Sequence, residues 1–167
     1  MKKPLLLIII ILIVLTLSFL IYSSFSKIED KKQFNAQIKS VPTTSIFHWI
    51  GTKPGINNQK TIILFFHPEC EHCQYEAKSI VSELNQFGST NIWWISSADK
   101  SSIQLFLKKY QLNTLPNQYF AHLPIELIST TFGSISVPHI FIYDENQHLL
   151  KEFKGETKIE ALLKYLH

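Results

Sequence analysis

Residues 61–66, with the sequence TIILFF, restrict the possible folds more than any other stretch of the chain. The stretch is apolar almost throughout and rich in residues that favour strands, and a turn-forming segment at residues 53–58 precedes it. A run of this kind fits a strand that is buried on both faces, as in a parallel or mixed sheet covered by helices. We therefore expect an α/β fold in which helices lie on both sides of a central sheet.

Further helices and strands follow from the spacing of the apolar residues. Helical spacing predicts helices that include Ala77–Leu84, Ile103–Tyr110 and Ile159–Leu166. Strands are expected at Ile46–Ile50, Ile92–Ile95, Ile140–Tyr143 and His148–Phe153, with a short strand at Tyr119-Phe120 and a short helix over Ile125–Phe132 that ends at Gly133. Thr157 and Glu160 have the spacing of a capping box at the start of the last helix.

Composition and charge exclude several functions. The chain has 167 residues, which favours one domain on a prior of about 100–200 residues per domain. All 16 basic residues are lysines, so the chain has no arginine clamp for phosphate or carboxylate groups. Its lysines form no basic block or stripe of the kind that nucleic-acid binding requires, and we expect no nucleic-acid partner.

The N-terminal residues favour a membrane anchor. Residues 4–22 carry no charge, and as a helix they would reach about 28 Å, close to the bilayer core of about 30 Å. Lys2 and Lys3 precede this run, and no A-x-A cleavage pattern follows it. We expect an uncleaved signal anchor that makes a single pass through the membrane, with a cleaved signal peptide as the alternative.

The chain is accordingly divided into three parts. We expect a signal anchor or transmembrane helix at residues 1–22, a polar stalk or lead-in at residues 23–45, and a folded domain at residues 46–167. A bare lysine count favours a cytoplasmic domain, because four lysines follow the apolar run within residues 27–39 and only two precede it. Long domains translocate largely regardless of charge, however. We therefore expect the C-terminal domain to face the periplasm or extracytoplasmic space from the cell membrane.

Cys70 and Cys73 form a C-x-x-C motif at the point where a helix should begin. The free N–H groups and the dipole of a helix N-terminus stabilise a thiolate, so Cys70 is the expected nucleophile. Cys73 follows one turn later on the same face and is the expected resolving thiol. A protonated His72 would favour the Cys70 thiolate further, whereas Glu71 would oppose it.

The segment FFHPECEHC with its flanking strand and helix, together with Val137-Pro138 before IFIYDENQHLLKEFKG, resembles the thioredoxin-like superfamily. Within it, residues 46–167 are most similar to membrane-anchored thiol–disulfide oxidoreductases of the TlpA/ResA type. The resemblance implies a thioredoxin-like three-layer sandwich, a central mixed β-sheet flanked by helices, with Cys70 and Cys73 as the redox-active pair. It also implies that Pro138 lies in a cis peptide facing the cysteines, and that the backbone of Val137 binds an extended substrate segment.

The chain departs from these relatives at several positions. Leu64 occupies the position of the buried acid of thioredoxin, so a proton acceptor is missing there, and Glu69 replaces the tryptophan that precedes the first cysteine. Lys78 replaces the proline of the following helix. A peroxiredoxin would have threonine or serine where this chain has His67, which disfavours peroxidase activity.

From the residues and the resemblance together, we expect a thiol–disulfide oxidoreductase that exchanges a Cys70–Cys73 disulfide or dithiol with cysteines of exported proteins. The resemblance implies the reductive direction, and His72 favours the opposite one. A reductase in this position would be re-reduced by an integral-membrane electron donor, and the membrane itself would be contacted through residues 4–22. We expect no cofactor.

The motif also fits three roles without catalytic turnover. His67, Cys70, Cys73 and His139 could form a soft site for Cu(I), which would make the protein a copper chaperone on a thioredoxin fold. The motif could also be half of a zinc site, although a tetrahedral structural site needs four ligands and the chain has no second ligand pair. A structural disulfide in a redox-inactive, anchored interaction domain is the remaining alternative. We expect no metal site.

Overall fold

The computed structural model describes residues 11–23, 38–55 and 58–167. The chain divides into two compact units, Met1–Gln37 and Ile38–His167. In the first unit, residues 11–23 form a helix that is exposed over nearly its whole length. Among the described residues, no helix is both long and apolar enough to cross a membrane. The anchor predicted over residues 4–22 lies partly outside the described residues, and most of the stalk predicted at residues 23–45 also lies outside them. Both stay predictions.

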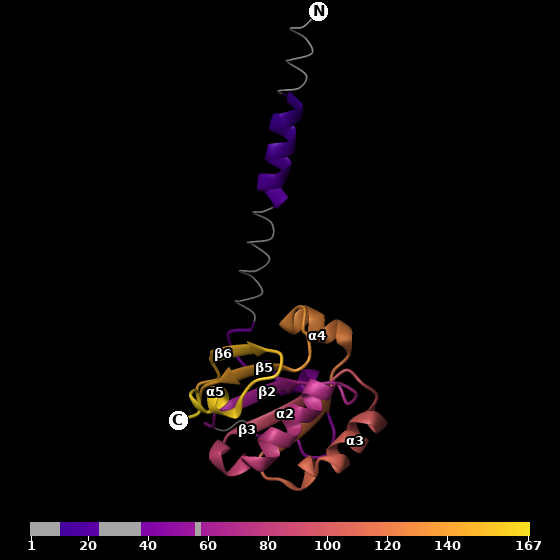
Figure 1. The fold of residues 1–167 in the computed structure, drawn as a ribbon, viewed down its shortest axis with the longest axis vertical. Coiled ribbons are helices and arrows are strands. Elements are labelled where there is room, and N and C mark those ends of the chain that lie inside the picture. The colour runs from indigo at the N-terminus through magenta and orange to yellow at the C-terminus, as the bar shows by residue number, and fades with distance from the viewer. Residues whose placement is uncertain (1–10, 24–37, 56–57) are drawn as a thin grey trace, which may run out of the picture. The chain divides into compact units, whose positions relative to one another are not determined.

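The second unit contains one mixed sheet with the strand order β1-β4-β3-β2-β5-β6 among the described residues (Figure 1). Its strands are β1 (His48–Trp49), β2 (Thr61–Phe65), β3 (Asn91–Ser96), β4 (Gln118–His122), β5 (His139–Tyr143) and β6 (Leu149–Lys154). β2 pairs in parallel with β3, which pairs in parallel with β4, whereas β1, β5 and β6 each run antiparallel to their neighbours. The α-helices are α2 (Glu71–Ser82), α3 (Lys100–Lys109), α4 (Ile125–Phe132) and α5 (Ile159–Leu163).

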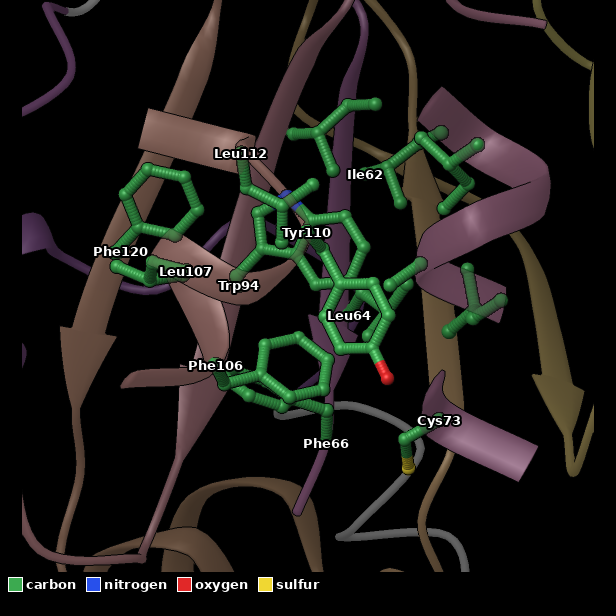
Figure 2. Close-up of a cluster of buried hydrophobic side chains, with 14 of the residues drawn as sticks. Ile62, Leu64, Phe66, Cys73, Trp94, Phe106, Leu107, Tyr110, Leu112 and Phe120 are labelled. Atoms are coloured by element: carbon green, nitrogen blue, oxygen red, sulfur yellow. The ribbon is translucent and has the colours of Figure 1, made fainter. Parts of the chain in front are cut away.

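The central strand β2 confirms the expectation that its apolar run is buried on both faces, because all five of its residues are buried. Ile62 and Leu64 point to one face of the sheet, where they pack with residues of α2, α3 and α5 (Figure 2). Phe65 points to the other face and packs edge-on against Phe132 of α4, with ring centroids 4.7 Å apart. The sheet therefore lies between helices, as a three-layer arrangement requires.

An aromatic cluster fills the face of the sheet that α4 covers. Phe132 contacts Phe65, Phe141 of β5 and Phe47, and Phe47 in turn packs against Trp93 of β3. Aromatic side chains bury large areas and prefer such tilted and edge-on contacts. The cluster holds α4, which leads into the Val137-Pro138 segment, firmly against the sheet.

The compact unit begins before the domain boundary predicted at residue 46. Ile38 is buried, the backbone N–H of Val41 donates to the carbonyl of Gln147, and Ser40 forms a bridge with His148. Polar composition suggested a stalk here, but backbone hydrogen bonds to the β5–β6 turn do not depend on apolar side chains. The first strand is also shorter than expected, because residues 44–46 form a 3₁₀ turn ahead of β1.

The capping box predicted at Thr157 and Glu160 is wrong. Lys158 is the N-cap of α5, with no side-chain cap, and the Thr157 hydroxyl donates to the carbonyl of Gly155 instead. The backbone N–H of Thr157 donates to the carboxylate of Glu76 in α2. A long-range contact therefore takes the place of the local one.

Candidate active site

Cys70 lies at the N-cap of α2, as the sequence predicts, in the loop that follows β2. Its backbone N–H donates to the carbonyl of His67, and the side chain of Gln74 donates to the carbonyl of Pro68. These bonds tie the loop to the first turn of the helix and hold Cys70 at the start of α2.

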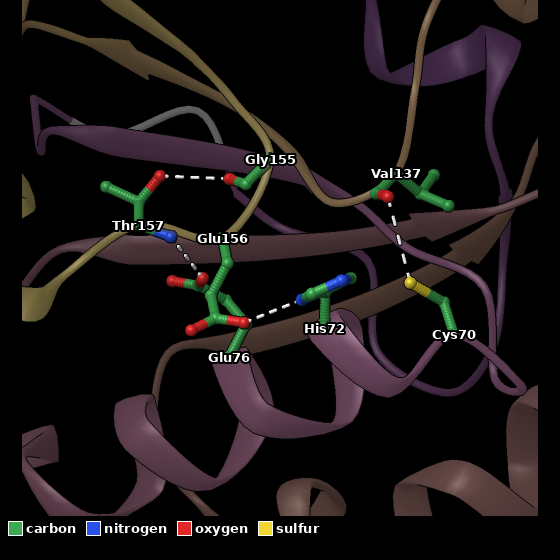
Figure 3. Close-up of polar contacts among 7 residues, drawn as sticks. All are labelled: Cys70, His72, Glu76, Val137, Gly155, Glu156 and Thr157. Carbon is green, nitrogen blue, oxygen red and sulfur yellow. Dashed lines mark hydrogen bonds and ion pairs between the residues drawn. The ribbon is translucent and has the colours of Figure 1, made fainter.

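The structure brings Val137 and Pro138 to Cys70. The Val137-Pro138 peptide is cis, and the Cys70 thiol lies 3.7 Å from the carbonyl oxygen of Val137, to which it donates a weak hydrogen bond (Figure 3). Val137 is 37% exposed, so this residue is accessible from solvent beside the sulfur. The role of this segment in substrate binding stays a prediction.

Cys73 is completely buried and belongs to the apolar core cluster that also contains Phe66 (Figure 2). Both cysteines are free thiols in this structure. Burial, together with the neighbouring Cys70, holds the pKa of the Cys73 thiol well above its usual range. A resolving thiol in this position needs a base to take its proton.

Glu76 is a buried acid that the sequence analysis missed. It lies one turn after Cys73 in α2 and is 0% exposed. One carboxylate oxygen accepts the backbone N–H of Thr157 at 2.9 Å, and the other has no hydrogen-bond partner among the described residues. Burial raises the pKa of Glu76 to about 7, which is a suitable value for exchanging a proton near neutral pH.

A signal for Glu76 was present in the sequence. Three positions after Cys73, Glu76 occupies the same helix face as Cys73, Ala77 and Ile80, and all four are buried. A buried acid was expected only at position 64, where thioredoxin has one and this chain has Leu64. In this chain the acid approaches the cysteines from the helix instead of the strand.

His72 and Glu71 occupy the first turn of α2, as the motif requires. Both are exposed, and Nδ1 of His72 lies 2.8 Å from a carboxylate oxygen of Glu156, in the loop between β6 and α5 (Figure 3). No sequence pattern indicates this partner, because 84 positions separate the two residues. His72 is thus paired with a carboxylate, so any electrostatic effect of His72 on Cys70 is combined with that of Glu156.

The residues proposed as a Cu(I) site are not gathered around one point. Nδ1 of His67 accepts the backbone N–H of Glu69, and Nε2 of His139 lies 2.7 Å from a carboxylate oxygen of Glu152 in β6. The ring of His139 stacks on Phe141, on the face of the sheet opposite Cys73. Within the described part of the chain, no group of three or more histidine, cysteine or acidic side chains is placed to hold a metal ion.

A surface groove borders the cysteine motif. It has a volume of about 540 Å³, and its walls are the loop before Cys70 and one side of α3. His67, Pro68 and Glu69 form the first wall, and Asp99, Ser102, Leu105, Phe106 and Lys109 line the second. Leu105 is 70% exposed, so an apolar side chain lies open to solvent beside the site. The sequence did not predict that α3 would contribute to it.

Comparison with solved structures identifies the architecture. StoA from Bacillus subtilis superposes with a TM-score of 0.60 over 77% of this chain and 99% of its own, at 20% identity. A secreted disulfide oxidoreductase of Mycobacterium tuberculosis, homologous to E. coli DsbE, gives 0.55 over 66% and 82%, at 18% identity. The chain has a thioredoxin-like fold. This confirms the predicted fold of the folded unit.

Similarity at this level of identity shows the fold and does not separate the activities that share it. The bacterioferritin comigratory protein of Xanthomonas campestris, which reduces alkyl peroxides, superposes equally well, with a TM-score of 0.60 over 77% of this chain and 96% of its own at 14% identity. No protein-family model matches the sequence, and no curated protein is similar to it. The function must therefore be argued from the site.

We predict that the ionisation of Glu76 destabilises the folded protein. An acid whose pKa rises from 4.5 to about 7 on folding contributes stability that is complete below pH 4.5 and is lost as the pH rises through 7, by at most about 3 kcal/mol. Glu76→Gln should remove this part of the pH dependence. Urea unfolding of the reduced protein between pH 4.5 and 8 measures it.

Glu83→Gln, at the exposed end of the same helix, is the matched control and should retain the pH dependence of the wild type. An identical pH profile for Glu76→Gln and the wild type would contradict the prediction.

Proposed function

We propose that the folded unit is a thiol–disulfide oxidoreductase that exchanges a Cys70–Cys73 disulfide or dithiol with cysteines of exported proteins. One observation carries the proposal: a half-buried thiol at a helix N-terminus lies 3.7 Å from the backbone carbonyl oxygen of Val137, an exposed residue, and a second thiol is buried one turn further along the helix. The first thiol is accessible to a protein disulfide, and the second is shielded from it. Because of this difference, Cys70 can attack the substrate disulfide, and Cys73 can react only with the mixed disulfide formed on Cys70.

In the reductive direction, the Cys70 thiolate attacks one sulfur of the substrate disulfide. A mixed disulfide forms with Cys70, and the other substrate sulfur leaves as a thiolate and takes a proton from solvent. The Cys73 thiol then passes its proton to the Glu76 carboxylate and attacks Cys70 Sγ, which releases the second substrate thiolate. The substrate gains two electrons, and the protein is left with a Cys70–Cys73 disulfide.

Glu76 supports this sequence because the high pKa of Cys73 would otherwise make its thiolate rare. A carboxyl group with a pKa of about 7 is ionised in part of the molecules at neutral pH and can accept the proton without leaving a charge in the core. Its fixed bond to Thr157 keeps it in place through the cycle. Glu76 therefore takes the role of the proton acceptor that is missing at Leu64.

The rim of the site supports a protein substrate rather than a small molecule. The Val137 carbonyl lies beside Cys70 Sγ, where an extended segment can pair with the backbone and be held in line for sulfur attack. The groove on the other side of the motif offers the exposed side chain of Leu105 to apolar side chains of the same substrate. A peroxide would need neither surface.

We further propose a membrane-anchored reductase of the TlpA/ResA type, with the domain on the extracytoplasmic side. The uncharged run at residues 4–22 and the lysines before it support the anchor. An integral-membrane electron donor would then return the Cys70–Cys73 disulfide to the dithiol. The substrates would be oxidised exported proteins.

The cysteine variants test the chemistry. Purified full-length protein in detergent should reduce a model protein disulfide, Cys70→Ser should abolish the reaction, and Cys73→Ser should accumulate a mixed disulfide because resolution is blocked. Non-reducing electrophoresis measures the trapped species. The double variant Cys70→Ser/Cys73→Ser is the control and should trap nothing, and full activity of Cys70→Ser would overturn the assignment.

The reduction potential tests the direction. A value near about −270 mV is expected for a reductant, whereas a strong oxidant lies near about −120 mV. Equilibration with glutathione or dithiothreitol buffers, followed by alkylation of the free thiols, measures it. A value at the oxidising end would reverse the proposed direction and leave the exchange chemistry intact.

Fractionation tests the anchor. The full chain should stay in the membrane pellet after an alkaline carbonate wash, and a chain that lacks residues 1–22 should be released, because the uncharged run supplies the hydrophobic attachment. Protease added to spheroplasts should digest the domain if it faces outward. Release of the full chain by carbonate would contradict the anchor, and protection from protease would contradict the orientation.

A further inference from the structure

We infer that Glu156 is a positioning residue that sets the reduction potential of the Cys70–Cys73 pair through His72. The inference rests on the proposed exchange function and assigns a regulatory role within it to a loop that is distant in sequence. Glu156 does not touch the cysteines. It acts on the charge that His72 presents to them.

The contact is direct and short. His72 lies inside the cysteine motif, and its Nδ1 is 2.8 Å from a carboxylate oxygen of Glu156. In Figure 3, the His72 ring points toward Glu156, whereas Cys70 Sγ points toward the Val137 carbonyl. The histidine side chain is 71% exposed and the glutamate side chain 41% exposed, so both can be substituted without opening the core.

Backbone bonds on both sides of Glu156 hold it over α2. The N–H of Gly155 donates to the carbonyl of Pro138 at 2.8 Å, and the N–H of Thr157 donates to the buried carboxylate of Glu76 at 2.9 Å. The loop is therefore fixed to the Pro138 segment and to α2 by bonds that do not involve the Glu156 side chain. These bonds place the Glu156 carboxylate beside His72.

The electrostatic consequence follows from the charges of the pair. A protonated His72 alone, two residues from Cys70, would stabilise the thiolate and with it the reduced protein, which raises the reduction potential. With Glu156 ionised at 2.8 Å, the pair has no net charge, and its field at Cys70 is that of a dipole. Glu156 thus opposes the oxidising effect of His72.

The remaining charged groups near the pair do not replace Glu156. Glu71 and Glu76 lie on α2 itself, and Lys158 follows in the same loop. The carboxylate of Glu76 accepts the backbone N–H of Thr157. Glu71 is the same in the wild type and in a Glu156 variant, so its charge does not differ between them. The charge of Glu156 also raises the pKa of Glu76, so substitution of Glu156 acts on both His72 and Glu76. A His72→Gln background separates the two effects.

An ordinary surface ion pair would affect stability alone, and only slightly. The positioning role makes a different prediction, because it changes the equilibrium between the disulfide and the dithiol. That equilibrium is protein disulfide plus two reduced glutathione molecules against protein dithiol plus one oxidised glutathione. Its constant reports the charge near Cys70 and is insensitive to equal changes in the stability of the two forms.

The experiment compares full-length wild type with Glu156→Gln in glutathione buffers at pH 6 and pH 8. At pH 6, Glu156→Gln should shift the equilibrium three- to tenfold toward the dithiol, a rise of about 15–30 mV. At pH 8 the shift should be less than twofold, because imidazole side chains in general lose their positive charge as the pH rises over this range. Glu160→Gln, an exposed carboxylate in the first turn of α5, is the matched control and should change neither value.

Two further variants make the test specific. Glu156→Asp should retain most of the wild-type equilibrium, and Glu156→Gln should have no effect in a His72→Gln background, because no imidazole charge remains to be cancelled. An unchanged equilibrium at pH 6, or an equal shift in the His72→Gln background, would overturn the inference and leave the exchange function standing. Failure of the cysteines to equilibrate with glutathione would overturn the proposed function and the inference together.

Discussion

The burial of β2 on both faces is the constraint on which the rest of the structure depends. A strand without a solvent-facing side needs helices on both sides, and the connection from β2 to β3 supplies one of them as α2. α2 must begin where β2 ends, and that junction is the position of Cys70. The antiparallel pairing of β2 with β5 then brings the start of β5, and with it Pro138, to the same end of the sheet. The reactive thiol and the segment beside it are therefore placed by the packing of one strand.

Much of this architecture could be predicted from the sequence, because its causes are local. Short runs of strand-favouring apolar residues located β2, β3 and β5, and helical periodicity located the long helices. The expected short helix over residues 125–132 has the same bounds in the structure. The cysteine motif located the thiol at the start of α2 for the same reason, since a strand, a turn and a helix start are neighbours along the chain.

The parts that could not be predicted depend on contacts between distant residues. The pairing of His72 with Glu156 and the bond from Thr157 to Glu76 each join segments more than 80 positions apart. The capping box failed for this reason, because a local pattern at Thr157 competed with the unsatisfied carboxylate of Glu76 and lost. A buried carboxylate needs a donor more than an exposed helix end does. The early start of the compact unit has a similar cause, since residues 38–41 are held by backbone bonds that leave no mark in side-chain composition.

The edges of the sheet limit how another chain can approach it. β1 at one edge has two residues, and β6 at the other carries Lys151, Glu152 and Lys154. Short edge strands and charged side chains hinder the addition of a foreign strand. An unfolded protein that meets this domain is consequently discouraged from joining the sheet at its margins, where it would be bound without being near sulfur. Under the proposed function, backbone recognition would be directed instead to the segment beside Cys70, where binding can lead to reaction.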